Sequence, residues 1–140
     1  MSARERSTAV YAVFDASVFV RAIVPLEASA LGWVQRAIGR EVSVSVPSLV
    51  FAEVGNALCT YARETTITLD GALRRLAFVV RMPLEIRELE NLVGPAVGEA
   101  TSRGLTVYDA CYAVLAEAED AVLVTADRGL AAAVAQAELI

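Results

Sequence analysis

Short apolar segments alternate with longer helical patterns along the chain, and this alternation limits the possible folds more than any other feature. Val10–Phe14, Val42–Val46 and Ala121–Thr125 are short, rich in β-branched residues and bounded by polar or turn-forming residues, as strands are. Leu84–Ile86 and Glu138–Ile140 are candidates for two further short strands. Strands that alternate with helices pack as a parallel sheet covered by helices. We therefore expect an α/β fold, a three-layer α/β/α sandwich with a central, mainly parallel sheet.

Helical patterns fill the segments between these strands. We expect helices over residues 17–24, 31–38, 48–63, 69–80, 88–103 and 106–119, and a short Ala-rich helix after Asp127. Gly94-Pro95 should kink the helix over 88–103, and Gly104 should end it. Because no repeat, linker or low-complexity tract divides the 140 residues, we expect one soluble domain over residues 1–140.

The types of basic residue exclude several chemistries. The chain contains no His, and all 12 of its basic residues are Arg. Nucleophilic triads need an imidazole base, a Walker A loop and Schiff-base catalysis need Lys, and zinc hydrolases normally use His ligands. Any reaction must therefore rely on carboxylates, hydroxyls, Arg, thiols or a bound cofactor.

The cysteines and the N-terminus indicate the compartment. Cys59 and Cys111 each lie in an apolar helical pattern without C-x-x-C spacing, so we expect buried, reduced thiols, which fits a cytoplasmic protein. No uninterrupted apolar segment follows Met1–Arg6 before Asp15, so we expect no secretory signal. We also expect no membrane span, since no apolar run approaches the length of about 18 residues that a span requires.

Four carboxylates occupy comparable places relative to the predicted strands. Asp15 and Asp127 directly follow Val10–Phe14 and Ala121–Thr125, and Glu53 and Asp109 lie in the first turns of two helices. Each has an ordinary structural explanation: three can serve helix starts, and Glu53 can extend to water from a helix edge. Ligands of parallel α/β sheets bind outside the carboxyl ends of the strands, however, and all four are expected at that edge.

Four anions at one edge repel one another and need compensation. Because the chain has neither Lys nor His, the available compensating groups are Arg and a metal ion. An all-oxygen site suits Mg²⁺ or Mn²⁺, which bind through a few carboxylates, water and substrate phosphate oxygens. Such an ion can activate water for attack on phosphorus without a histidine base.

The segments around these acids resemble the acidic motifs of PIN-domain ribonucleases, in the order and at about the spacing of the VapC toxins. They are Val13-Phe-Asp-Ala-Ser17, Phe51-Ala-Glu-Val-Gly-Asn-Ala-Leu58, Leu105-Thr-Val-Tyr-Asp-Ala110 and Leu123-Val-Thr-Ala-Asp-Arg-Gly-Leu130, and the resemblance extends from about Tyr11 to the C-terminus. It implies an endoribonuclease that depends on Mg²⁺ or Mn²⁺, the toxin of a type II toxin–antitoxin pair. Such toxins are usually homodimers inhibited by a VapB-like antitoxin.

The resemblance also implies roles for individual residues. Asp15, Glu53, Asp109 and Asp127 match the family's catalytic and metal-binding acids, with Asp15 and Asp109 the first choices for direct metal contact. Ser17 and Thr125 match hydroxyl positions that support the site. Two alternatives stay open: an RNA-processing nuclease without an antitoxin, and a catalytically silent PIN module that binds RNA or protein.

The net charge of −5 opposes binding of a polyanion such as RNA. The four acids supply most of that charge, and each divalent ion returns two positive charges. Arginines near the site must assist, and the candidates are Arg21, Arg36, Arg40, Arg74, Arg75 and Arg81. We expect a folded or looped RNA read at a few unpaired bases.

The apolar content of 56% predicts an interface with another subunit or protein. Arg74-Arg75 and the apolar segment Ser17–Val24 could form a groove for an amphipathic antitoxin helix. That segment could equally be a dimer interface or part of the core.

Three other classes of α/β protein are excluded because this chain lacks residues that they require. A receiver domain needs paired acids after the first strand and a Lys, and a haloacid-dehalogenase-type phosphatase needs a Lys and an Asp where Ser17 stands. A dinucleotide-binding domain needs G-x-G-x-x-G after its first strand, where this chain has Asp15-Ala-Ser-Val-Phe19.

Overall fold

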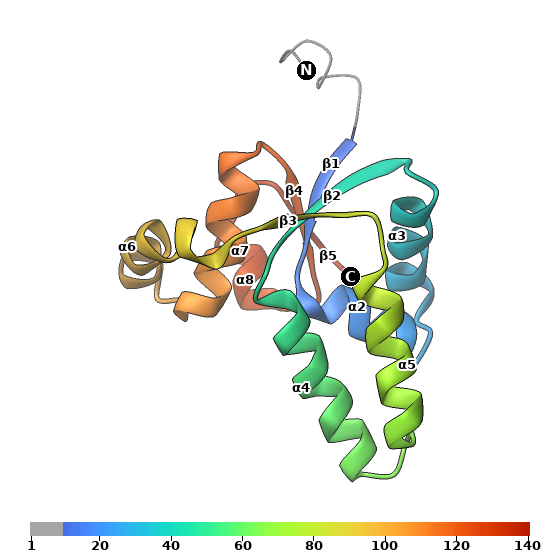
Figure 1. The fold of residues 1–140 in the computed structure, drawn as a ribbon. Coiled ribbons are helices and arrows are strands. Elements are labelled where there is room, and N and C mark those ends of the chain that lie inside the picture. Colours follow the sequence, from blue (N-terminus) through green and yellow to red (C-terminus); the bar gives the residue numbers. More distant parts are fainter. Residues whose placement is uncertain (1–9) are drawn as a thin grey trace.

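The computed structural model describes residues 10–140, and five strands in this part of the chain form one sheet (Figure 1). The strands are β1 (Val10–Phe14), β2 (Val42–Pro47), β3 (Leu84–Arg87), β4 (Val122–Thr125) and β5 (Ala137–Leu139). Their order is β3-β2-β1-β4-β5, and each neighbouring pair is parallel. The predicted parallel sheet is confirmed, including the short strand at the C-terminal edge. The prediction for Met1–Arg6 lies outside the described residues.

Helices cover both faces of the sheet, as predicted for a three-layer sandwich. They are α2 (Ala16–Ile23), α3 (Ala28–Ile38), α4 (Val50–Arg63), α5 (Leu69–Val80), α6 (Val93–Arg103), α7 (Val107–Ala118) and α8 (Arg128–Ala132). α7 packs on β1, β2 and β4, with α6 outside it, and α2 and α3 pack on the other face. α4 and α5 form a hairpin that extends beyond the carboxyl edge of the sheet (Figure 1).

The single kinked helix predicted over residues 88–103 is wrong. A 3₁₀ turn covers Leu89–Asn91, and α6 begins separately at Val93. Pro95 therefore lies in the first turn of α6. Backbone N–H groups in a first turn have no intrahelical acceptor, so the lack of an N–H in proline breaks no helical hydrogen bond. Gly104 ends α6 as predicted, with a left-handed φ of 69°.

The core is built from β-branched and aromatic residues of the sheet and its covering helices. Phe14, at the end of β1, is fully buried, and its ring lies 5.6 Å from that of Phe19 and 5.9 Å from that of Trp33. These contacts fix the end of β1 against α2 and α3. They thereby fix the position of the next residue, Asp15.

The two cysteines differ in exposure. Cys111 is buried as predicted, but Cys59 is exposed, so that prediction is wrong. The buried stripe of α4 is formed by Val50, Val54 and Leu58. Cys59 follows Leu58 directly and is therefore rotated about a quarter turn away from the core.

No single helix within residues 10–140 is long and apolar enough to cross a membrane. α2 and α3 pass that test only when taken together, and the break between them bends the pair by 104°.

Candidate active site

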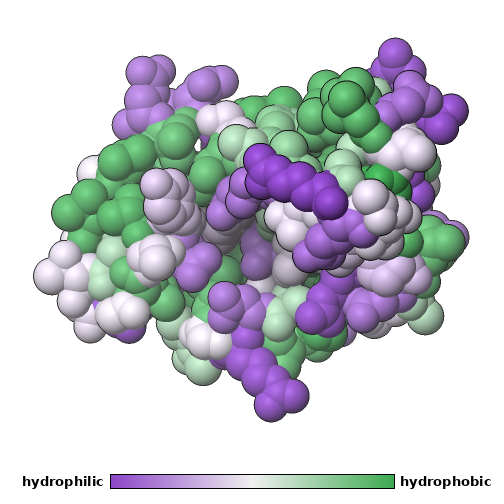
Figure 2. Space-filling view, turned by 90° about the horizontal axis from the view of Figure 1, so that it is seen from below, coloured by the Kyte–Doolittle hydropathy of each residue, from purple (hydrophilic) through white to green (hydrophobic). Residues whose placement is uncertain are grey.

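The direction of the strand order reverses between β1 and β4, which lie side by side at the centre of the sheet. Ligands of such sheets bind in the crevice outside the carboxyl ends of the strands at this switch point. Asp15 follows β1 as the N-cap of α2, and Asp127 follows β4 as the N-cap of α8. Figure 2 views the molecule from this side, where hydrophilic residues surround a hollow near the middle of the face.

Asp15 is held by a hydroxyl group from the start of α2 and another from the end of β4. Its Oδ1 accepts hydrogen bonds from the Ser17 N–H, at 3.0 Å, and from the Ser17 hydroxyl, and its Oδ2 accepts one from the Thr125 hydroxyl. The Ser17 Oγ in turn accepts the Ala126 N–H, and the Thr125 Oγ1 accepts the Asp127 N–H, each at 2.9 Å. Ser17 and Thr125, both singled out from the sequence, thus lie directly against Asp15. Burial raises the pKa of Asp15, and these hydrogen bonds only partly offset the rise.

Glu53 receives its partner from a different helix. On α4 it is half-buried, and its Oε1 accepts a hydrogen bond of 2.5 Å from the phenolic hydroxyl of Tyr112 on α7. Burial raises the pKa of Glu53, the Tyr112 hydrogen bond lowers it, and the charges of Asp109 and Asp15 raise it further, with a net rise. Tyr112 was not among the site residues predicted from the sequence. The available signal was its spacing of three residues from Asp109, which places both on one side of α7.

Asp109 lies in the first turn of α7, half-buried, and Thr106 caps that helix by accepting the Asp109 N–H at 3.1 Å. Burial raises the pKa of Asp109, and the charges of Asp127 and Asp15 raise it further. Asp127 is exposed, and its Oδ1 accepts the Leu130 N–H at 3.0 Å. The capping explanations for Asp15 and Asp127 are therefore confirmed, but capping does not remove their charges from this edge.

The four carboxylates interact electrostatically. The negative charge of Asp15 raises the pKa of both Glu53 and Asp109, and the charge of Asp127 raises the pKa of Asp109. Within residues 10–140, no three acidic or thiol side chains converge closely enough to enclose a metal ion. Mg²⁺ commonly binds through one or two carboxylates and keeps several waters. The oxygen donors and the shared negative charge therefore fit a hard divalent ion bound by one or two carboxylates and water, and a closed protein cage does not fit.

A groove of about 450 Å³ adjoins Glu53. Asn56 and Tyr108 line it with Glu53, together with apolar groups of Ala16, Leu49 and Ala52. Tyr108 is 63% exposed, so its ring is accessible from solvent. Neither Asn56 nor Tyr108 was predicted from the sequence, because they come from α4 and α7 and meet only in the folded chain.

Most of the arginines expected beside the site already have partners within the chain. Arg21 forms an ion pair with Glu27 at 3.4 Å, and Arg74 forms one with Asp70 at 3.3 Å. The Arg36 guanidinium lies 4.3 Å from the centre of the Trp33 ring. Arg75 donates hydrogen bonds to the backbone carbonyls of Ile23 and Gly71. Arg40 and Arg81 have no ion pair with any of the described residues. Arg75 joins α5 to the end of α2, which is a structural role.

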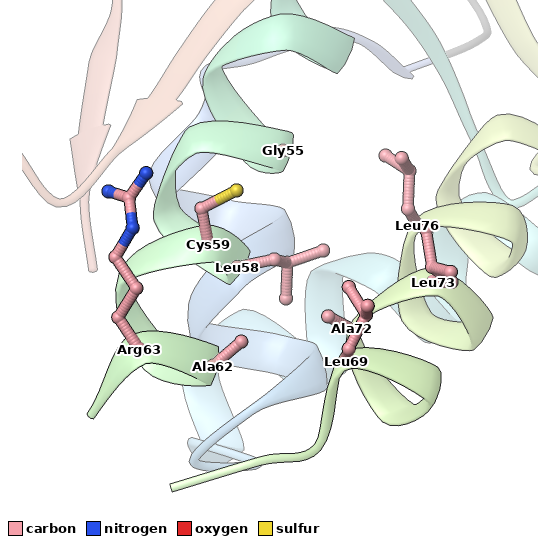
Figure 3. A pocket seen from close by; sticks show the side chains of 9 residues that line it. All are labelled: Gly55, Leu58, Cys59, Ala62, Arg63, Leu69, Ala72, Leu73 and Leu76. Atoms are coloured by element: carbon pink, nitrogen blue, oxygen red, sulfur yellow. The ribbon is translucent and has the colours of Figure 1, made fainter. Parts of the chain in front are cut away.

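A second hollow of about 460 Å³, apolar in character, lies between α4 and α5. Leu58, Ala62, Leu69, Leu73 and Leu76 line it from both helices, with Cys59 and Arg63 on the α4 side (Figure 3). The groove expected along Ser17–Val24 differs from this one, because Val18, Phe19 and Ala22 are buried in the core. The α4–α5 hairpin, and not Ser17–Val24, therefore presents an open apolar groove.

Fold and site together define a parallel α/β domain with an acidic site at its topological switch point. The model of the PIN domain family matches residues 12–135, and the chain belongs to this family. It is 32% identical over 121 residues to Ribonuclease VapC3 of Pyrobaculum aerophilum, covering 85% of this chain and 91% of that protein. The predicted similarity to VapC proteins is thereby confirmed.

Solved structures show the same architecture. PAE2754 from Pyrobaculum aerophilum superimposes with a TM-score of 0.74 at 32% identity, over 93% of this chain and 90% of that one. A chain of VapBC2 from Rickettsia felis, solved bound to a DNA fragment from its promoter, gives a TM-score of 0.65 at 19% identity, over 94% and 98% of the two chains. At that identity the second similarity concerns the fold alone.

Proposed function

We propose that this chain is a divalent-metal-dependent endoribonuclease and the toxin of a VapBC-type toxin–antitoxin pair. The observation that carries the proposal is the group of four interacting carboxylates at the carboxyl ends of β1 and β4. Its placement on a chain 32% identical to Ribonuclease VapC3 supports RNA as the substrate.

Asp15 and Asp109 would make the first contacts with Mg²⁺ or Mn²⁺, and Glu53 and Asp127 would contribute to binding the ion. The bound ion would supply positive charge that activates water and stabilises the charge developing on the phosphate. Ser17 and Thr125 fix both oxygens of Asp15, so this carboxylate is oriented before any ligand arrives. Preorganisation of this kind lowers the reorganisation that binding requires.

The groove beside Glu53 supports binding of unpaired RNA. The exposed ring of Tyr108 can stack on a base, and the Asn56 amide can hydrogen-bond to a base edge. Such contacts need little positive charge, which suits a chain with a net charge of −5. A looped or single-stranded element is therefore the substrate class we propose.

An antitoxin partner is supported by the similarity in fold to a chain of VapBC2 from Rickettsia felis and by the identity of 32% to Ribonuclease VapC3. The apolar groove between α4 and α5 is a surface that an amphipathic helix of a VapB-like partner could cover (Figure 3). A homodimer would cover apolar surface outside that groove, such as Phe78 and Val80 of α5, which are 44% and 54% exposed.

Cleavage of RNA by the purified protein tests the proposal. We expect internal cuts in the presence of Mg²⁺ or Mn²⁺, no cuts with excess EDTA, and recovery when Mn²⁺ is restored, because carboxylates alone cannot offset the phosphate charge. Sequencing of RNA ends after brief induction would identify the target. Growth arrest that Asp109→Asn relieves would support a toxin, and cleavage without arrest would point to an RNA-processing nuclease. Cleavage that persists unchanged in EDTA would contradict the metal-dependent mechanism.

A further inference from the structure

Tyr112 is the largest fully buried side chain among residues 10–140, at 1% exposure. Its ring is part of the core, but its hydroxyl points at a carboxylate of the candidate active site. The hydroxyl oxygen lies 2.5 Å from Glu53 Oε1. A buried hydroxyl needs a hydrogen-bond partner, and here the partner is an acid of the site, although a backbone carbonyl would satisfy it equally well.

The hydrogen bond joins two helices that carry different acids. Glu53 belongs to α4, whereas Tyr112 and Asp109 belong to α7, one turn apart. Through this bond, α7 both presents Asp109 and fixes the position of the Glu53 carboxylate. The spacing between these acids is therefore set by one rigid turn of helix and one short hydrogen bond.

The bond also distinguishes the two oxygens of Glu53. Oε1 is occupied by the phenol, and Oε2 accepts no hydrogen bond from the described residues. Glu53 lines the groove beside the site, so Oε2 is the oxygen available to a ligand or to water there. Burial and the Glu53 carboxylate both raise the pKa of Tyr112, which keeps the phenol a donor at neutral pH.

Asp15 is held in a comparable way, by the hydroxyls of Ser17 and Thr125. Hydroxyl donors that do not belong to the four carboxylates thus set the orientation of two of them, Asp15 and Glu53. Groups that orient metal ligands commonly change metal affinity or activity by about 10-fold to 100-fold when removed.

We propose that Tyr112 is a positioning residue, which orients the Glu53 carboxylate for metal-dependent cleavage through its phenolic hydroxyl. The inference rests on the proposed nuclease function. The competing explanation is that the hydroxyl only satisfies a buried polar group and contributes to stability alone.

Tyr112→Phe removes the hydroxyl and keeps the ring. We expect kcat for RNA cleavage to fall about 10-fold or more, with KM for RNA changed less than about 2-fold, and Mn²⁺ affinity measured by calorimetry to weaken by about 10-fold. The matched control is Tyr61→Phe on α4, whose hydroxyl bonds to none of the described residues and whose loss should change neither quantity. A Tyr112→Phe protein with a lower melting temperature but wild-type kcat and Mn²⁺ affinity would overturn the inference.

A double-substitution cycle separates action through Glu53 from a general effect. In the Glu53→Gln background, Tyr112→Phe should weaken Mn²⁺ binding much less than it does in the wild-type background, because the oriented carboxylate is already gone. Equal losses in both backgrounds would contradict a role through Glu53. A wild-type protein that neither binds Mn²⁺ nor cleaves RNA would refute the proposed function, and with it the inference. A wild-type protein that does both, and is matched by Tyr112→Phe, would refute the inference alone.

Discussion

Asp15→Asn is expected to lower kcat for RNA cleavage by about 100-fold to 1000-fold while the protein stays folded. The substitution removes the charge that the proposed site needs and preserves the side-chain shape. The amide oxygen can still accept the Ser17 N–H, and the Thr125 hydroxyl can rotate to accept from the amide nitrogen. Single-turnover cleavage in Mn²⁺, with circular dichroism spectra of both proteins, measures the two effects separately.

The matched control is Asp70→Asn, which makes the same change at an exposed position. The Asp70 side chain is 77% exposed on α5 and, among residues 10–140, forms an ion pair with Arg74 alone, so its loss should leave kcat unchanged. Wild-type kcat in Asp15→Asn would remove that carboxylate from the mechanism. An equal fall in both variants would indicate a nonspecific electrostatic effect.

Asp109→Asn is expected to make the protein inactive but more stable at neutral pH. Burial and the charges of Asp127 and Asp15 raise the pKa of Asp109 above its ordinary value of 3.8, so the folded state binds the proton more tightly than the unfolded state does. Ionised Asp109 therefore costs folding stability at pH values above its folded pKa. The cost disappears as pH falls through the folded pKa towards 3.8. Asparagine removes the charge and with it the cost.

Thermal unfolding at several pH values tests this sign. Without added metal, Asp109→Asn should unfold at a temperature several degrees higher than wild type at neutral pH, and the difference should shrink in acid. Asp70→Asn, again the control, should show no such gain. A variant that unfolds below wild type at neutral pH would mean that Asp109 contributes a stabilising interaction in the folded state. The four carboxylates would then not repel one another in the way that we describe.

The parallel sheet and two of its acids were predictable from local pattern. Short β-branched runs form strands wherever helices separate them, and an Asp directly after such a run must lie at the carboxyl edge of the sheet. Asp15 and Asp127 follow from that rule alone, and their capping roles follow from N-cap chemistry. The C-terminal strand was recognisable for the same reason, although only three residues form it.

Features that depend on which helices meet could not be predicted in this way. α7 is apolar on nearly every side, so periodicity does not show that Tyr112 faces Glu53 on α4. Cys59 was misplaced because α4 contains apolar residues beyond its narrow buried stripe. The intrachain partners of several arginines were equally unpredictable, because a carbonyl at a helix end, such as that of Ile23 for Arg75, has no sequence signature.

Calorimetric titration of the purified protein with Mn²⁺ tests the central claim most directly, because it measures the metal without requiring a known RNA. We predict saturable binding by the wild-type protein, weakened at least about 10-fold in both Asp15→Asn and Asp109→Asn and unchanged in Asp70→Asn. Absence of saturable binding, or wild-type affinity in both active-site variants, would contradict the claim that these carboxylates together hold a divalent ion.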